Sequence, residues 1–572
     1  MFLKKVLTYL MAPTPALIAT AFIVGLGGGF GAVIFRWLIQ FFTRVFFHHF
    51  PQSISGLGEH TVILIPAVGA ILFSPLIYFF AREAKGHGVP EVMEAMELRG
   101  GKIRSIVVII KAVASSLCIG SGGSVGREGP IVQIGSALGS TVGQTLRFSE
   151  ERVKNLVACG AASGIAATFN APIGGVIFAL EIILRDFSTR RLAAVVIASV
   201  IASVIGQVFL GTQPSITVPP YTLRSPIELL FYLGFGFLLV PFCIVFIKLI
   251  YKFEDAFNKL PLHELGKPVI GGLLLGSIGF FYPQVFGVGY SNIEKVVHNL
   301  MPLELMLILI PMKIVAVSLT LGSGGSGGIF APSLIIGALI GGCFGTSLDL
   351  LFPDLGIEPG AYALVGMGAF FAGAAHAPIT SILILFELTG DYLIILPLML
   401  SVIITTIASE RLHPESIYTL KLVRRGINIG RDIRYDLLSD MTVREIVMKE
   451  IPTVKPSANI DEILLAFESG KRGAVAVVEN DGTFHGLITI DDILTSLKYH
   501  DSLINLVVAE DLAKKGKFVT VKESLNEALR KFLEIDDNVL PVLKTNKGKI
   551  TLIGIISRHD LLSAYSRKAR IT

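Results

Sequence analysis

The chain has 572 residues, of which 52% are hydrophobic and 16% charged, and its mean hydropathy is +0.69. This composition excludes an ordinary water-soluble protein and predicts a chain that lies largely in a lipid bilayer. The formal net charge is only +5, and no stripe of Lys and Arg interleaved with aromatic residues occurs, so we expect no nucleic-acid partner. The four cysteines lie in apolar runs without ligand-like spacing, so we expect neither disulfides nor a metal site.

The chain begins with Lys4 and Lys5, which precede an apolar stretch from about Leu17 to Phe47. This stretch is longer than the core of a signal peptide, so we expect a retained first membrane helix with a cytoplasmic N-terminus. Further apolar segments follow, and several are shorter than the ~20 residues that a straight span needs. Short helices interrupted by Gly or Pro are typical of transporters, where the irregular backbone lines the binding site.

One glycine-rich stretch occurs twice. Gly-Ser-Gly-Gly-Ser-Val-Gly-Arg-Glu-Gly-Pro at 120–130 returns 202 positions later as Gly-Ser-Gly-Gly-Ser-Gly-Gly-Ile-Phe-Ala-Pro at 322–332. Glycines let the backbone approach a ligand closely, and the first amides of a following helix are unpaired and lie at the positive end of its dipole. The pattern therefore predicts an anion-binding loop. A flexible turn between two membrane helices is the alternative, but it explains neither the duplication nor the Arg-Glu pair in the first copy.

A second duplication supports the first. Asn-Ala-Pro at 170–172 and His-Ala-Pro at 376–378 lie 206 positions apart, and each is followed by a glutamate nine residues after its proline. The similar offsets predict that residues 100–210 and 303–412 are halves of one duplicated unit. We expect the halves to insert in opposite orientations, with their loops meeting near the middle of the membrane.

The composition changes after about Arg424, where charges become frequent and no stretch could span a bilayer. Gly-Leu-Ile-Thr-Ile-Asp-Asp at 486–492 returns as Gly-Ile-Ile-Ser-Arg-His-Asp at 554–560, and each copy follows a β-like run and precedes an apolar helical start. We therefore expect a membrane domain at 1–425, a linker at 426–436, and two copies of a soluble α/β module at 437–500 and 501–572.

Three loops, at 86–91, 120–130 and 327–332, resemble the signature loops of the CLC family of chloride channels and proton/chloride exchangers. The soluble repeat resembles a tandem pair of CBS domains, which many members of that family carry. The resemblance implies an all-α polytopic membrane domain of two inverted repeats with short broken helices, followed by an α/β pair of CBS domains. It also implies a homodimer embedded in lipid, a multi-pass protein of a prokaryotic inner or cell membrane with cytoplasmic CBS domains.

The resemblance also implies residue roles. Glu128 takes the place of the family's external gate, whose ionised carboxylate competes with the anion and leaves when protonated. An ionisable group beside an anion loop in low dielectric is a functional candidate on physical grounds too, although a simple ion pair with Arg127 is the structural alternative. Tyr418 matches the tyrosine that closes the inner side of the central anion site, whereas by itself it would predict an interfacial anchor. The implied anion-binding positions are His87, Gly126, Arg127, Gly129, Ile329, Phe330, Ala331 and Tyr418.

Two positions depart from the family pattern. Chloride-selective members usually have Ser where this chain has His87, so the preference among chloride, nitrate and other anions stays open. The imidazole could donate to the anion, more strongly when protonated, or turn away and leave only backbone amides there. Many exchangers carry a further glutamate directly after the position of Glu181, where this chain has Ile182, so the proton route also stays open. We expect Glu181 and Glu387 themselves to satisfy helix ends.

In the soluble repeat, the resemblance implies an adenine nucleotide such as ATP, ADP or AMP in the cleft of the CBS pair. Asp492 and Asp560 would bond ribose hydroxyls, and Thr489 and Ser557 would approach phosphate at a helix start. A CBS pair that serves only as a dimerisation plate is an equally open interpretation. No cofactor is required for the membrane domain.

The leading functional hypothesis is exchange of chloride, or a similar monovalent anion, for protons. A passive chloride channel on the same scaffold, gated by voltage or pH, is the alternative that Ile182 favours. A CBS-regulated cation transporter would need more inward carboxylates than Glu128, Glu181, Glu387 and Asp391 supply. A membrane-tethered nucleotide sensor would leave the duplicated loops unexplained, and no nucleophile-base pair indicates an enzyme.

Overall fold

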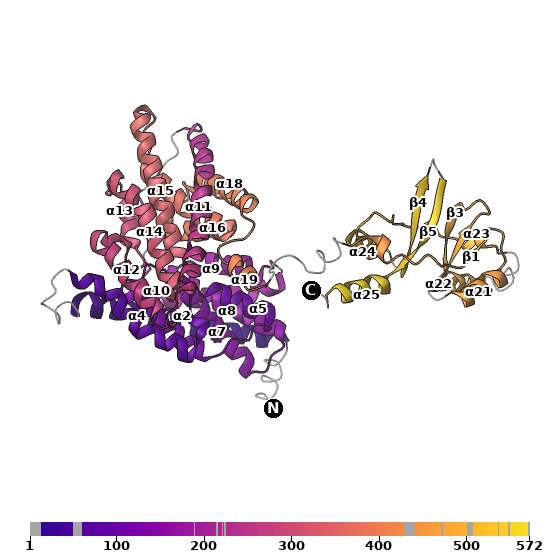
Figure 1. The fold of residues 1–572 in the computed structure, drawn as a ribbon, viewed down its shortest axis with the longest axis horizontal. Helices are drawn as coiled ribbons and strands as arrows, with labels where there is room; N and C mark the ends of the chain where they lie inside the picture. Colours follow the sequence, from indigo (N-terminus) through magenta and orange to yellow (C-terminus); the bar gives the residue numbers. More distant parts are fainter. Residues whose placement is uncertain are drawn as a thin grey trace. The chain divides into compact units, whose positions relative to one another are not determined.

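The chain forms two compact units, Met1–Ile427 and Asn428–Thr572, in a computed structural model (Figure 1). Lys4, Lys5 and the predicted linker 426–436, apart from its first two residues, lie outside the residues that the structure describes. The structure describes residues 13–49, 60–187, 189–212, 216–219, 221, 225–427, 441–470, 473–499, 507–535, 537–546 and 549–569.

The regular elements in the described residues of the first unit are all helices, joined by loops and turns. Seven of these described helices are long and apolar enough to cross a membrane, and shorter apolar helices such as Ile106–Gly120 and Pro172–Leu184 lie among them. The predicted combination of long and short helices is therefore confirmed. The helices of the first half are α2 (Pro13–Arg44), α4 (Thr61–Phe80), α5 (Val89–Leu98), α6 (Ile106–Gly120), α7 (Glu128–Thr145), α8 (Glu150–Phe169), α9 (Pro172–Phe178) and α10 (Thr189–Leu210).

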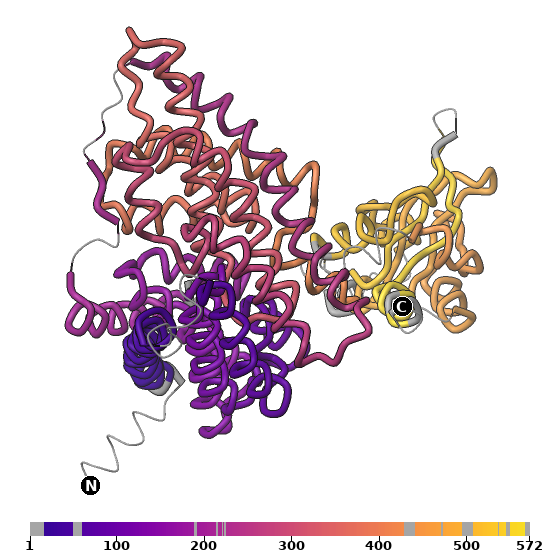
Figure 2. The backbone as a smooth tube through the Cα atoms, turned by 60° about the vertical axis from the view of Figure 1, so that its left-hand side comes forward, coloured from indigo at the N-terminus to yellow at the C-terminus, as the bar shows by residue number. Residues whose placement is uncertain are grey.

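The second half repeats this order of helices, and a last short helix follows it. In Figure 2 the first half, indigo to magenta, and the second, rose to orange, occupy largely different parts of the unit. The second-half helices are α11 (Glu228–Lys259), α12 (Lys267–Phe281), α13 (Tyr290–Val297), α14 (Leu303–Ser323), α15 (Phe330–Leu351), α16 (Pro359–Ala375), α17 (Pro378–Thr389) and α18 (Ile395–Leu412), and the last helix is α19 (Thr419–Arg424).

The structural repeat begins earlier in each half than the sequence motifs do. Gly86 and Gly88 precede α5 with φ of +77° and +84°, and Gly287 and Gly289 precede α13 with φ of +62° and +83°. Glycine adopts such left-handed conformations without steric cost, whereas other residues are strained there. The two loops before α5 and α13 are therefore equivalent, although their sequences share little beyond these glycines.

The two repeats hold each other through a pair of glutamates. Glu387 of α17 accepts hydrogen bonds from the first amides of α9, Ile173 and Gly174, at 3.0 and 2.6 Å. Glu181, which follows α9, accepts from the first amides of α17, residues 379–380, at 3.2 and 2.7 Å. The first amides of a helix have no partner within it, so each glutamate satisfies the start of the other repeat's helix. The expected role of both residues at helix ends is confirmed.

The second unit contains two small sheets flanked by helices. The first sheet has the order β1-β2-β3, with β1 parallel and β3 antiparallel to β2, and the second is the antiparallel pair β4-β5. Each sheet ends in the predicted β-β-α pattern. The elements are β1 (Thr453–Val454), α21 (Ile460–Ser469), β2 (Ala474–Val478), β3 (Phe484–Thr489), α22 (Ile490–Tyr499), α23 (Ala509–Leu512), α24 (Leu525–Leu533), β4 (Val539–Asn546), β5 (Lys549–Ser557) and α25 (Arg558–Ala569).

The cores of the second unit interlock its two halves. Val443, from the start of the first half, packs in the core built on β4, β5, α24 and α25. Leu512, from the start of the second half, packs in the core that includes Val477 and Ile488 of the first sheet. A third apolar cluster joins the first sheet to Val539 and Ile555 of the second sheet. Because each half completes the core of the other, the pair folds as one unit.

Candidate anion site

Three loops of the membrane unit meet in its interior, although they lie far apart in the sequence. The amide of Gly86 donates to Gly325 O at 3.0 Å. Gly126 and Gly328 exchange amide-carbonyl hydrogen bonds of 2.7 and 2.6 Å. These bonds place the loop before α5, the loop before α7 and the loop before α15 side by side.

Each of these loops ends at the start of a helix, so three helix N-termini are gathered at one place. Their first amides have no intrahelical partner and carry the positive end of the helix dipole, which is an arrangement suited to an anion. Gly129, in the first turn of α7, lies so close to the neighbouring loop that a Cβ atom there would be 2.1 Å from His87 O. The approach of the three loops therefore depends on glycine at this position.

Glu128 is the first residue of α7 and its side chain is buried among these loops, with the residue only 1% exposed. One carboxylate oxygen accepts a hydrogen bond from Tyr290 Oη at 2.9 Å, and the other accepts from the amide of Ala331 at 3.3 Å. Arg127 Nε lies 4.0 Å from the carboxylate. The backbone of Gly126 also contacts the carboxylate closely, since a Cβ atom at position 126 would be 2.1 Å from Glu128 Oε2. The carboxylate thus occupies the start of α15 and is held more closely by Tyr290 than by Arg127.

His87 and Tyr418 lie close together in the interior of the membrane unit. Both residues are buried, and their rings lie 6.4 Å apart between centroids. His87 Nδ1 is buried and has no hydrogen-bond partner in the described part of the chain. Ile329 immediately precedes α15 and Phe330 begins it, with the Phe330 ring packed against Phe371. The structure thus brings the predicted site residues together around the three helix starts.

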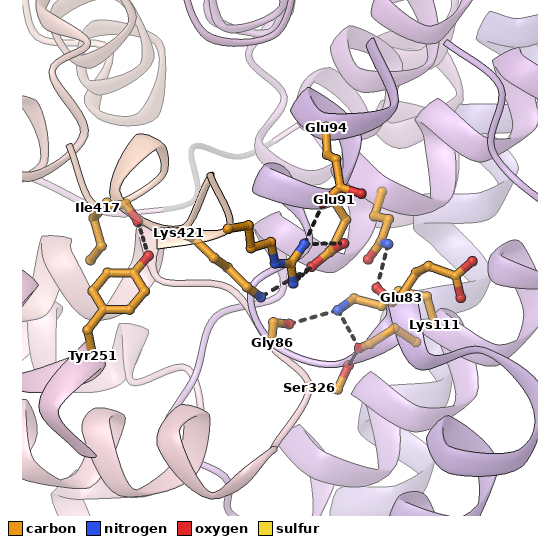
Figure 3. Close-up of polar contacts among 12 residues, drawn as sticks. Glu83, Gly86, Glu91, Glu94, Lys111, Tyr251, Ser326, Ile417 and Lys421 are labelled. Atoms are coloured by element: carbon orange, nitrogen blue, oxygen red, sulfur yellow. Dashed lines mark hydrogen bonds and ion pairs between the residues drawn. The ribbon is translucent and has the colours of Figure 1, made fainter. Parts of the chain in front are cut away.

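Three residues that the sequence analysis did not single out support this arrangement. Lys111 of α6 is fully buried and donates to Ala84 O at 2.9 Å and Gly86 O at 2.8 Å (Figure 3). Tyr251 donates to Ile417 O at 2.6 Å and fixes the residue before Tyr418. Tyr290 bonds Glu128. A lysine inside an apolar run is a recognisable functional signal in a membrane protein, but a single tyrosine is not.

Carboxylates of α5 anchor α19, which carries the chain out of the membrane unit. Glu91 lies 3.2 Å from Lys421 Nζ and 2.8 Å from a guanidinium nitrogen of Arg425 (Figure 3). Glu94 pairs with the same Arg425 at 2.6 Å. Since α5 follows His87 and α19 follows Tyr418, these ion pairs fix the two sides of the site relative to each other.

In the second unit, each predicted aspartate is bonded to the hydroxyl residue of its own motif. Asp492 accepts from the Thr489 amide at 2.8 Å and from its hydroxyl at 2.6 Å, and it also forms an ion pair with Lys514. Asp560 accepts from the Ser557 amide at 3.0 Å and its hydroxyl at 2.6 Å. In both motifs the carboxylate therefore supports the turn that begins the helix.

The carboxyl of Asp492 gives the second unit a predicted acid sensitivity. Its burial opposes ionisation, but hydrogen bonds from Lys514 and Thr489 outweigh burial and hold its pKa below the ordinary value. A carboxylate with a lowered pKa stabilises the fold above its unfolded-state pKa, and this contribution is lost as pH falls through the folded-state pKa. We expect hydrogen exchange of β2 and β3 in the full chain, corrected for intrinsic rates, to lose protection below about pH 4.

Asp492→Asn should remove this pH dependence and lower protection of β2 and β3 at neutral pH by about 1 kcal/mol, as loss of a helix-start cap does. The matched variant Asp560→Asn should affect β4 and β5 instead. Unchanged exchange of β2 and β3 in Asp492→Asn would contradict this assignment.

The described residues contain no group of three or more His, Cys, Asp or Glu side chains that could hold a metal ion.

Comparisons with known proteins agree with this geometry. The pattern of the family described as voltage gated chloride channel matches residues 68–410, and the CBS domain pattern matches 443–499 and 509–567. A putative chloride channel protein, ClcB-like, of Ralstonia nicotianae is 32% identical over 416 residues, which cover 71% of this chain and 97% of the relative. The H(+)/Cl(−) exchange transporter ClcA of Vibrio parahaemolyticus is 34% identical over 425 residues, 72% of this chain and 90% of the relative.

Among solved structures, that of a slow cyanobacterial Cl−/H+ antiporter matches with a TM-score of 0.66 at 26% identity, and the match covers 72% of this chain and 98% of that one. The family pattern spans more than half of the chain, and the chain covers 97% of the Ralstonia relative and 90% of the Vibrio relative. The predicted resemblance is confirmed. The chain belongs to the voltage gated chloride channel (CLC) family, whose members are membrane transport proteins rather than enzymes, and it carries two CBS domains after its membrane domain.

Proposed function

We propose that this protein exchanges chloride, or a similar monovalent anion, for protons across a membrane, with Glu128 as the external gate and proton acceptor. One observation carries the proposal: the Glu128 carboxylate accepts a hydrogen bond from the Ala331 amide at the start of α15, where helix geometry favours an anion. The Glu128 carboxyl group therefore occupies a place that suits a free anion.

Competition for this place would link the two transported ions. When ionised, Glu128 fills the outer site formed with Gly126, Arg127, Gly129 and Ala331. When protonated, the side chain no longer gains from the helix dipoles and leaves the site to an incoming anion. Each exchange of carboxylate for chloride then requires that a proton be taken up at Glu128.

The central site would lie one step further inward. The amides of Ile329 and Phe330 at the start of α15, the Tyr418 hydroxyl and the His87 imidazole supply its donors. The unpartnered Nδ1 of His87 supports a direct role for the ring, because a buried polar atom without a partner is costly unless a ligand satisfies it. Chloride-selective members of the family usually have a serine hydroxyl at the position of His87. The preference of this protein among chloride, nitrate and other anions therefore needs a direct measurement.

A passive channel is the second candidate, and Ile182 favours it. This side chain is apolar and buried, and its neighbour Glu181 is committed to the amides at the start of α17. The names of the relatives support both candidates: the Ralstonia protein is described as a putative chloride channel, whereas the Vibrio protein and the cyanobacterial structure are described as proton-coupled.

We further propose a homodimer in a prokaryotic inner membrane with the CBS pair in the cytoplasm. The apolar helices and the bacterial relatives support this location. Binding of ATP, ADP or AMP at the CBS pair, through the motifs that contain Asp492 and Asp560, is proposed as a regulatory input and rests on the CBS match.

The test uses purified protein in sealed liposomes with an imposed chloride gradient, while chloride efflux and internal pH are recorded together. We expect chloride flux that drives protons uphill in the wild type, and chloride flux without proton movement in Glu128→Ala. The control Glu83→Gln removes a carboxylate that pairs with Arg104 outside the site and should behave as wild type. Chloride flux without proton movement in the wild type would establish the channel instead, and absence of any anion flux would refute both.

A further inference from the structure

Tyr290 is placed at the gate by the second repeat. It begins α13, directly after Gly289, in the loop that is equivalent to the His87 loop of the first repeat. Its hydroxyl donates to Glu128 Oε1 at 2.9 Å. The Arg127 guanidinium carbon lies 5.1 Å from the centroid of its ring, within the range of a cation–π interaction. The loop before α5 thus carries the candidate site residue His87, and the equivalent loop before α13 leads into Tyr290, which contacts the gate.

The loop that carries Tyr290 is held firmly in place. Lys313 of α14 is buried and donates to Val285 O at 2.8 Å and Gly287 O at 3.2 Å. The amide of Gly287 donates to Gly122 O of the first anion loop at 3.3 Å. A donor held by a fixed backbone stabilises a charge without having to reorganise. The Tyr290 hydroxyl is therefore oriented toward Glu128 in advance.

The charged and titratable groups around Glu128 come from several elements. Arg127 precedes it on its own helix, and Arg36 of α2 lies near enough to Arg127 and Tyr290 to interact with both. Tyr418 is buried and lies near enough to Glu128 to interact with it electrostatically. Of these groups, Tyr290 donates a direct hydrogen bond to the carboxylate. A donor to a carboxylate bonds the ionised form more strongly than the protonated form.

We propose that Tyr290 is a positioning residue that holds ionised Glu128 in the outer anion site and thereby sets the pH at which the gate opens. The proposal rests on the proposed gate role of Glu128. Because the phenol stabilises the ionised carboxylate, its removal makes protonation easier. The gate of Tyr290→Phe should therefore open at a higher pH than that of the wild type.

The test measures chloride efflux from liposomes with equal pH on both sides, over a range of pH. Tyr290→Phe keeps the ring beside Arg127 and loses only the hydroxyl, and we expect the midpoint of the rate–pH curve to rise by roughly one pH unit. Tyr221→Phe is the matched control, since it removes a buried phenol that donates to Val297 O at 2.6 Å, away from the gate. Its midpoint should equal that of the wild type.

A double variant separates the two proposals. In Glu128→Ala the efflux should lose its pH dependence, and adding Tyr290→Phe should change nothing further. An unchanged midpoint in Tyr290→Phe, with normal pH dependence through Glu128, would overturn the positioning role and leave the gate intact. An effect of Tyr290→Phe in the Glu128→Ala background would also overturn it. Efflux whose pH dependence survives Glu128→Ala would overturn the gate itself.

Discussion

Gly160→Ala is expected to prevent the membrane unit from folding, because α7 and α8 cross with their backbones in contact. A Cβ atom at position 160 would lie 1.9 Å from Gly135 O and 2.3 Å from Gly135 C, both of them backbone atoms that cannot swing away. Overpacking of a well-packed interior usually costs about 1–3 kcal/mol, and a clash with backbone belongs above that range. The measurement is the yield of monodisperse protein in detergent and its thermal unfolding midpoint.

Two further alanine variants of the same chain provide an equivalent case and a control for this test. Gly366→Ala should be as damaging, because its Cβ would meet Gly337 O at 2.2 Å at the equivalent crossing of α15 and α16. Gly234→Ala is the matched control: it also adds a methyl group inside a helix, but no atom lies within 4 Å of it. It should leave stability unchanged or raise it, since Ala is a better helix former than Gly. Similar behaviour of Gly160→Ala and Gly234→Ala would show that the crossing can open.

Much of this fold was predictable because the repeats leave marks in the sequence. The two offsets, 202 and 206, identified the pairs α7–α15 and α9–α17, and the motif of the soluble repeat predicted its β-β-α endings. The equivalence of the earlier helices, such as α5 and α13, was not predictable. The loops before them share only their glycines, because each repeat uses this loop for a different contact.

Only those residues of the candidate site that lie in the motif loops could be predicted from the sequence. Glu128 and Ala331 lie in separate copies of the glycine-rich stretch, and the structure brings them into contact. Tyr290 lies outside the motifs, in a loop where an aromatic residue predicts only a membrane-interface position. Its contact with Glu128 depends on the packing of one repeat against the other, which no local pattern encodes.

Lys111→Met is expected to weaken chloride binding at the central site at least tenfold, or about 1.4 kcal/mol. Methionine keeps the length of the side chain and removes its donors and its charge. Two hydrogen bonds from a charged group, each contributing about 1.5–3 kcal/mol, would be lost from the loop that carries His87. Methionine also removes the free-energy cost of burying an ammonium group, which offsets part of this loss for the fold. The carbonyls of Ala84 and Gly86 each keep a second donor, the Ser326 hydroxyl and the Gly327 amide. The effect should therefore fall on the site more than on the fold, and calorimetric titration with chloride measures it.

Lys313→Met is the matched variant, because the second repeat uses the same device for another purpose. Lys313 holds the loop before Tyr290, as Lys111 holds the loop that carries His87. We expect Lys313→Met to retain chloride affinity and to shift the pH of gate opening upward, as Tyr290→Phe does. An equal loss of chloride affinity in both variants would show that the two ammonium groups act through the field of the whole domain. Separate effects would show that the lysine of the first repeat supports anion binding through the His87 loop, whereas the lysine of the second repeat supports control of the gate through the Tyr290 loop.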